Sequence, residues 1–407
     1  MRQFVKIVLL ATIVGITGSS AFAQKKGKKE AEKPAGYQFT VVKENPVTPV
    51  KNQASSGTCW SYSTISFLES EAIKAGAPAN IDLAEMYPVW NGYSDKAVKF
   101  VRLDGHLNYE QGRSFGDVIY TLKHYGMVPQ SEMEGLEYGE KLNKHGELCE
   151  ILKAYVNAVK KNPNRSLSPV WHKGLQAVLN TYLGECPEKF VVDGKEYTPQ
   201  TYAKEYLKLN ADDYVSITSY THYPFYSQFA IEVPDNWRWD LSYNVPLEEM
   251  MQIFDYAIEN GYTVAWGSDV SEQGFNRNGL GIVPDVEANK KEAGSDEARW
   301  IGKSPAEKNA AMNNQDAPGK ALKITQEMRQ AGYDNKTTTD DHGMHIYGIA
   351  KDQNGTKYYM VKNSWGPTGK YKGLWYVSES FVQYKTMNIV VHKNAIPKEI
   401  RKKLNIK

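Results

Sequence analysis

The two halves of this chain carry different apolar patterns, and this difference constrains the fold more than any other feature. In the front half, apolar residues recur at three- and four-residue spacing, which is typical of helices packed on one face. In the back half, short apolar runs rich in β-branched and aromatic residues indicate strands. Helices and strands segregated in this way predict an α+β fold. The pattern predicts helices over 59–76, 115–126, most of 145–210 and 247–260, and strands over 263–270, 345–352, 356–363, 373–381 and 387–392.

Composition and charge exclude several classes of protein. The chain has 407 residues, 41% hydrophobic and 24% charged, as in ordinary globular proteins. Its 49 basic and 47 acidic side chains give a formal net charge of +2, which is too balanced for a dedicated binder of nucleic acid or of anionic membranes. With 3 cysteines, the chain is neither a disulfide scaffold nor a multi-cysteine metal protein.

The N-terminus has the pattern of an export signal over residues 1–23. A basic start precedes an apolar run over 7–18, and Ala21 and Ala23 frame a small-x-small cleavage site. The alternative is a membrane anchor, but the run is shorter than the roughly 20 apolar residues that span a bilayer. We therefore expect cleavage after Ala23 and an exported mature protein, periplasmic or extracellular, without a membrane span. Residues 24–36 are charged and of low complexity, which predicts a flexible linker.

The segment KNQASSGTCWSYST contains the cysteine with the most informative neighbours. Cys59 opens a predicted amphipathic helix, and the positive end of the helix dipole favours the thiolate, which is the reactive form. Gly57 lets a substrate approach the backbone closely. The N–H of Cys59 and the side-chain amide of Gln53 are candidate donors to an oxyanion. The alternative is a buried structural cysteine, a common fate of this residue.

Two further segments supply partners for a cysteine nucleophile. His342 lies where a polar loop becomes a strand in DDHGMHIYGIAKD, and Asn363 ends a strand in YYMVKNSWG. Asn354-Gly355 between these strands is a strong hairpin signal, and the hairpin would bring His342 and Asn363 together. A thiol nucleophile needs a base, and the base needs an orienting partner. Trp365 would shield their hydrogen bond from water.

These three segments, with the sequences QASSGTCW, DHGMH and KNSWG, resemble the papain-like cysteine peptidases. They resemble the bleomycin hydrolase or aminopeptidase C branch more closely. The resemblance implies a papain-like fold with a helical half and a β-barrel-like half, and neither cofactor nor metal. By this resemblance, Cys59 is the nucleophile and His342 the general base, while Asn363 orients the base and Gln53 donates to the oxyanion. Gly112 and Trp365 are the substrate-binding residues that the resemblance implies.

The stretch between Cys59 and His342 is about twice the ~130–150 residues that separate these positions in papain-like enzymes. The surplus predicts a large helical insertion, and the bleomycin hydrolase branch carries a comparable one. We therefore expect a helical half with the nucleophile over 37–130 and the insertion over 131–215. A β-rich half with His342 and Asn363 would follow over 216–407.

The resemblance also raises the question of the C-terminal tail. Members of the bleomycin hydrolase branch use such a tail to limit themselves to free N-termini, and they are largely intracellular hexamers. Here the basic segment HKNAIPKEIRKKLNIK stops about where that tail would begin. We therefore do not expect specificity to come from a tail, and a hexamer rests on the resemblance alone.

Several other residues leave alternatives open. Cys149 and Cys186 either pair, as exported cysteines can, or remain core thiols. His342 and His345 form an H-x-x-H, but residues three apart on a strand face opposite sides, which argues against a shared metal. Asp340 and the next residue, also an aspartate, either favour charged His342 or form a solvated loop, and the solvated loop is the favoured interpretation.

Taken together, the residues and the resemblance predict an exported cysteine peptidase of the Cys-His-Asn type that acts on peptides. The expected activity is that of an aminopeptidase on short peptides, with no nucleic-acid partner. Two alternatives stay open. One is an endopeptidase with an open cleft, and the other is a catalytically silent peptide-binding protein of the same fold.

Overall fold

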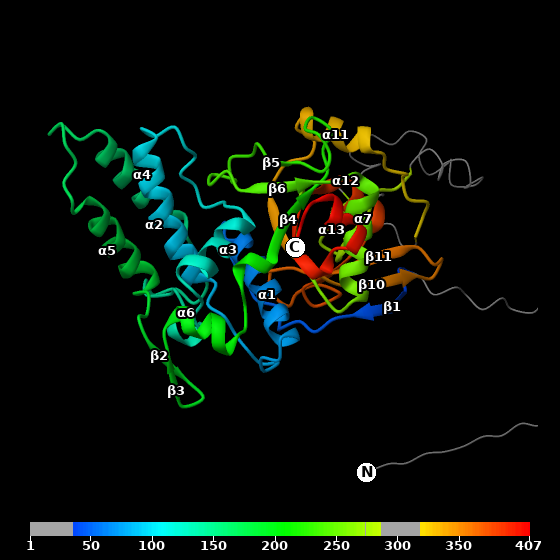
Figure 1. The fold of residues 1–407 in the computed structure, drawn as a ribbon, viewed down its shortest axis with the longest axis horizontal. Coiled ribbons are helices and arrows are strands. Elements are labelled where there is room, and N and C mark those ends of the chain that lie inside the picture. The colour runs from blue at the N-terminus through cyan, green and yellow to red at the C-terminus, as the bar shows by residue number, and fades with distance from the viewer. Residues whose placement is uncertain (1–35, 273, 286–317) are drawn as a thin grey trace, which may run out of the picture. The chain divides into compact units, whose positions relative to one another are not determined.

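A long hairpin of two antiparallel strands lies at the centre of the structure. The computed structural model describes residues 36–272, 274–285 and 318–407. Strand β10 pairs with β11 along one edge, and its other edge pairs first with β7 and then with β1 (Figure 1). Eleven of the described strands form one sheet in the order β5-β6-β4-β13-β7-β10-β11-β12-β9-β8, with β1 joined to β10.

The bounds of these strands are β1 Phe39–Glu44, β4 Tyr214–Thr218, β5 Gln228–Ala230, β6 Leu241–Asn244, β7 Val264–Ser268, β8 Phe275–Asn276, β9 Leu280–Gly281, β10 His342–Asp352, β11 Lys357–Lys362, β12 Leu374–Ser378 and β13 Thr386–His392. A separate hairpin consists of β2 Phe190–Val192 and β3 Lys195–Tyr197.

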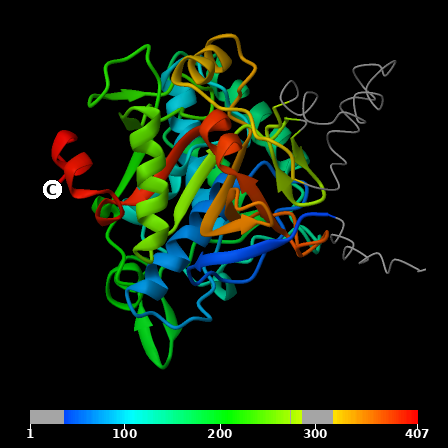
Figure 2. The same cartoon turned by 90° about the vertical axis from the view of Figure 1, so that its right-hand side faces the viewer.

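The helices divide into a group that packs on itself and a group that packs on the sheet. Helices α2, α4 and α5 contact one another, and their shared core includes leucines spaced four apart, such as Leu175, Leu179 and Leu183 (Figure 1). Helix α7 packs on the sheet, and the C-terminal α13 lies close to it (Figure 2). The bounds are α1 Cys59–Lys74, α2 Met86–Arg102, α3 Phe115–His124, α4 Gly146–Lys160, α5 Trp171–Leu183, α6 Pro199–Thr201, α7 Leu247–Glu259, α11 Gln326–Asp334, α12 Glu379–Lys385 and α13 Lys398–Lys403.

The predicted α+β class is confirmed, with the strands gathered into one large sheet. The hairpin at Asn354-Gly355 is also confirmed, and Gly355 has a φ of +83°, which glycine adopts without strain. The region expected to be mostly helical, 145–210, also contains a hairpin over 190–197. The prediction of a strand over 373–381 is wrong at its end, because the strand stops at Ser378. Ser378 caps a helix there, because its Oγ accepts from the N–H of Phe381 at 3.3 Å.

Three further predictions concern the N-terminus, the pairing of two cysteines and membrane spans. The signal over 1–23 and the linker, except Gly36, lie outside the described residues. Cys149 and Cys186 are both free thiols, so the pairing left open by the sequence is not formed. None of the helices in the described ranges has the length and apolar content needed to cross a membrane.

Helix α1 is buried on almost every side, although its apolar spacing predicts an amphipathic helix. It lies between β10 and the helices α2 and α3, and residues 60–72 are all buried. Its polar side chains are satisfied inside the protein. Ser61 Oγ donates to Glu85 O and Thr64 Oγ1 donates to Trp60 O, each at 2.7 Å. Burial of a hydroxyl costs little free energy when it keeps a hydrogen-bond partner, and this explains why α1 has no solvent-exposed face.

A buried charge network ties α1 to β11. Glu69 is buried, and its Oε1 accepts from Leu83 N at 2.9 Å, while its Oε2 accepts from Thr48 Oγ1. Lys362 Nζ donates to Thr48 Oγ1 at 2.8 Å, and Lys51 Nζ lies 4.0 Å from Glu69 Oε1. The negative charge of Glu69 therefore lies near the positive charges of buried Lys362 and half-buried Lys51, which come from different segments of the chain.

We expect Glu69→Ala to lower the free energy of unfolding by about 3–5 kcal/mol, because it leaves buried Lys362 without its nearby carboxylate. Urea unfolding followed by tryptophan fluorescence measures this change. Glu140→Ala is the matched control, since Glu140 forms an exposed pair with Lys144 and should matter little. Equal effects of the two substitutions would show that the buried network does not hold α1 in place.

Candidate active site

One cavity of about 390 Å³ has both Cys59 and His342 in its walls. Its walls come from the N-terminal end of α1, from α3, from strands β4, β6, β7, β10 and β13, and from the segment between β5 and β6. Of the described residues, none beyond Val390 lines it. The large apolar residues of the wall are Phe115, Ile119, Ile231, Val233, Leu241, Met387 and Val390, and the acidic residues are Asp212, Asp235, Asp240, Asp340 and Asp341.

Cys59 occupies the first position of α1, as the sequence predicts. Burial raises the pKa of its thiol to about 12, and the carboxylates of Asp340 and Asp235 act in the same direction. The backbone N–H groups of Gly343 and Trp60 lower it, but by less. Burial therefore opposes the effect of the helix end, and the expectation that Cys59 is a thiolate stays a prediction.

His342 is held by Asn363, as the hairpin predicts. His342 Nε2 lies 2.8 Å from Asn363 Oδ1, which also accepts from the N–H of Ser364 at 2.7 Å. Since an amide oxygen can only accept, Nε2 carries the proton and Nδ1 is left as the basic nitrogen. Burial lowers the pKa of His342, while the hydrogen bond to Asn363 raises it. The contact with Asn363 thus defines which tautomer the neutral imidazole adopts.

Trp365 covers this pair. Its ring centroid lies 4.8 Å from that of His342, with the planes tilted by 31°. The ring is 37% exposed, so one face meets solvent while the other meets the imidazole. This arrangement limits the access of water to the contact between His342 and Asn363, and a drier contact is stronger.

Gln53 joins the loop before the nucleophile to the turn after Asn363. Its Nε2 donates to Ser56 O at 2.8 Å, and its Oε1 accepts from Ser364 Oγ at 2.6 Å. Its backbone N–H also donates to Ser364 O, at 2.8 Å. The side-chain amide has two hydrogens, and Ser56 takes one of them. Gln53 does not line the cavity, so its role as an oxyanion donor stays a prediction.

Gly112 is not part of the cavity wall, although the sequence predicts that it binds substrate. Its carbonyl accepts from buried Lys96 Nζ at 3.1 Å. A Cβ at this position would lie only 2.0 Å from Asp235 Oδ2, so the carboxylate rests directly on the glycine. The space that a side chain would fill is occupied by Asp235.

The sequence analysis missed two acidic residues that line the cavity, Asp340 and Asp235. Asp340 and Asp341 were both interpreted as a solvated loop, and this holds only for Asp341, which is exposed and accepts from the N–H of Val270 at 2.8 Å. Asp340 lines the cavity instead, and burial raises its pKa to about 7. Asp235 lies between β5 and β6 and carries no motif, so no sequence signal could have identified it.

The interpretation of the histidine pair agrees with the structure. His345 is fully buried, and its Nδ1 lies 2.9 Å from Ser66 Oγ in the core, whereas His342 lines the cavity. Within the part of the chain that the structure describes, no group of three or more His, Cys, Asp or Glu side chains is placed to hold a metal ion.

Comparisons with known proteins agree with this geometry. A model of the Peptidase C1-like family matches residues 110–292 and 305–407, and one of the papain family cysteine proteases matches 35–89. Aminopeptidase G of Lactobacillus delbrueckii subsp. lactis is 23% identical, with 88% of this chain and 83% of the relative covered. Bleomycin hydrolase of Rattus norvegicus is 22% identical, with 92% and 86% covered.

A solved structure supports the fold. The crystal structure of PepW from Lactobacillus rhamnosis has a TM-score of 0.66 and 20% identity, and the match covers 90% of this chain and 84% of that one. The family matches lie on both sides of the cavity and include the segments of Cys59, His342 and Asn363. The chain therefore belongs to the Peptidase C1-like family, and the prediction of a papain-like cysteine peptidase related to aminopeptidase C and bleomycin hydrolase is confirmed.

Proposed function

We propose that this protein is an exported aminopeptidase that trims short peptides by a Cys-His-Asn mechanism. One observation carries the proposal: Cys59, the first residue of α1, lines the same cavity as His342, which is hydrogen-bonded to Asn363. Relatives named aminopeptidase G, E and C favour removal of N-terminal residues. The export signal supports a periplasmic or extracellular location.

The chemistry follows from the protonation states of the resting site. His342 Nδ1 takes the proton from Cys59 as the sulfur attacks the peptide carbonyl. The Cys59 N–H and the free amide hydrogen of Gln53 donate to the developing oxyanion. The imidazolium then gives its proton to the leaving amine, which leaves a thioester on the enzyme. Water hydrolyses the thioester, with His342 again as the base.

An endopeptidase is the second candidate. It is favoured by the finding that none of residues 391–407 lines the cavity, so these residues do not close it. A third reading, a silent peptide-binding protein, would keep the cavity without turnover. Hydrolysis and the position of the cut separate the three functions.

We expect the protein to remove residues from peptides with a free N-terminus and to leave their N-acetylated counterparts intact. Mass spectrometry of paired digests with reductant present reads the cuts. Cys59→Ala should reduce the rate by at least about a thousandfold, since it removes the nucleophile. Internal cuts in both peptides would establish the endopeptidase, and an equal rate for Cys59→Ala would refute a cysteine mechanism.

Asn363→Ala should lower kcat by about 10²–10³-fold, because His342 loses its orientation and its preferred tautomer. The hydrogen bond to Asn363 raises the pKa of His342. Its loss should therefore move the acidic limb of the pH–rate profile to lower pH. A profile of kcat/KM against pH measures both effects. Unchanged kcat with an unshifted limb would contradict the role of Asn363, and Asn335→Ala, on an exposed turn after α11, is the control.

Expression of the full chain in a bacterium with a secretion pathway should yield mature protein that begins at Gln24, outside the cytoplasm. N-terminal sequencing and cell fractionation measure this. Replacing Ala23 by a bulky residue should block processing, because the cleavage site requires small residues. Unprocessed protein that stays in the cytoplasm with Met1 intact would refute export.

A further inference from the structure

Two loops meet at the end of the sheet where β10 begins with His342. The loop before β10 covers residues 335–341, and the loop after β7 covers residues 269–272. In the ladder between these strands, His342 lies opposite Ser268, the last residue of β7. The side chain of His342 therefore starts from a backbone position that depends on how these two loops are held together.

Hydrogen bonds join the two loops in both directions. Asp269 Oδ2, after β7, accepts from the N–H of Thr339, before β10, at 3.0 Å. In return, Asp341 Oδ1 accepts from the N–H of Val270 at 2.8 Å, and its Oδ2 accepts from the N–H of Ser271 at 3.1 Å. Each loop therefore supplies a carboxylate and at least one backbone donor, so neither can shift without breaking contacts with the other.

A further contact between the loops passes through Lys385, the last residue of α12. Its side chain is 2% exposed and forms an ion pair with Glu272 in the loop after β7. Its Nζ also donates to Thr337 O at 2.8 Å and to Thr338 Oγ1 at 3.1 Å, both in the loop before β10. An ammonium group has three donors, and all three have partners here. The lysine thus bridges the two loops from beneath.

The backbone of Lys385 contacts the end of β7 as well. Its carbonyl accepts from the N–H of Asp269 and from Ser268 Oγ, each at 3.1 Å. The next residue, Thr386, pairs with Ser268 in the ladder between β13 and β7. Lys385 is therefore fixed by its backbone to the strand that lies beside His342, while its side chain reaches both loops.

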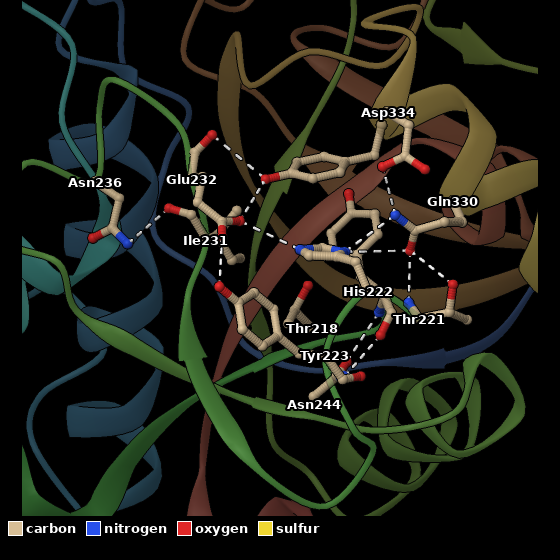
Figure 3. Close-up of polar contacts among 12 residues, drawn as sticks. Thr218, Thr221, His222, Tyr223, Ile231, Glu232, Asn236, Asn244, Gln330 and Asp334 are labelled. Carbon is tan, nitrogen blue, oxygen red and sulfur yellow. Dashed lines mark hydrogen bonds and ion pairs between the residues drawn. The ribbon is translucent and has the colours of Figure 1, made fainter.

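The other end of the loop before β10 is fixed by α11. Gln330 Oε1 accepts from the N–H of Thr221, in the loop after β4, at 2.6 Å, and its Nε2 donates to Asp334 Oδ1 at 2.7 Å (Figure 3). The N–H of Thr338 donates back to Gly332 O at 2.9 Å. Since α11 is held in this way, the rest of the loop is positioned by the contacts with Lys385 and the two carboxylates.

Stability alone does not account for a lysine in this place. Desolvation of two ions offsets much of their attraction, so a buried ion pair adds little net stability. The ammonium does act on its neighbours. Burial raises the pKa of Asp269 to about 6, and Lys385 opposes this effect, as does the N–H of Thr339. Lys385 thereby helps to keep Asp269 ionised, which is the form that accepts hydrogen bonds at both oxygens.

We propose that Lys385 is a positioning residue for the general base, and that by holding the loop before β10 against the loop after β7 it sets the place of His342 relative to Cys59. The inference rests on the proposed function and adds to it a residue outside the cavity wall. Asn363 orients the imidazole ring, whereas Lys385 fixes the backbone that carries the ring. A misplacement of about 1 Å can lower a rate about a hundredfold, so this backbone position matters for turnover.

The test replaces Lys385 by methionine, which is also long and unbranched but has no donors. We expect kcat to fall at least about tenfold and KM to change less than about twofold, because Lys385 does not line the cavity that binds the peptide. Lys385→Arg keeps the charge and the donors and should retain more of kcat than Lys385→Met. The matched control is Lys357→Met, which removes a lysine paired with Glu379 of the same helix and should leave both constants unchanged.

A milder variant keeps the test valid if Lys385→Met does not fold. Asp269 accepts from the N–H of Thr339 through Oδ2 and from the N–H of Ser271 through Oδ1, at 2.9 Å for the second contact. Asp269→Asn has nearly the same shape but one acceptor oxygen in place of two, so it loses one of these contacts. We expect kcat to fall severalfold with KM again nearly unchanged. Circular dichroism identifies the variants that are folded.

Alkylation of Cys59 by iodoacetamide, followed by mass spectrometry, tests the inference without turnover. The rate should fall in Lys385→Met and in Asp269→Asn but not in Lys357→Met, because a displaced His342 is a poorer base for the thiol. A parent protein that shows this pattern but hydrolyses no peptide would refute the proposed function and support the inference. Unchanged kcat and alkylation in the folded variants, or a rise in KM alone, would overturn it.

Discussion

The site depends on the packing of α1 against the sheet. The helix is surrounded by the sheet and by α2 and α3, so residues 60–72 are buried, and Cys59 at the start of the helix lines the cavity. Burial raises the pKa of the Cys59 thiol and lowers the pKa of His342. The pair must therefore exchange a proton during the reaction, which makes the orientation of His342 by Asn363 decisive. The buried charges of Glu69 and Lys362 are a consequence of the same packing.

The parts of the site that the sequence predicted are those encoded by local chemistry. Cys59 follows a glycine-containing loop and begins a helix, and the turn at Asn354-Gly355 fixes the register that brings His342 to Asn363. Each signal lies within a few residues of the chain and depends on turn or helix geometry. For the same reason the α+β class could be recognised from the change in apolar spacing.

What the sequence could not predict depends on contacts between distant segments. The apolar spacing of α1 marked only one face, because its serines and threonines are polar in sequence and become buried only once partners such as Glu85 O are in place. Likewise, Asp235 has no motif, and its position arises from anchors on α3, α11 and the loop after β4. Asp340 was assigned to solvent by its polar neighbours, although only Asp341 faces outward.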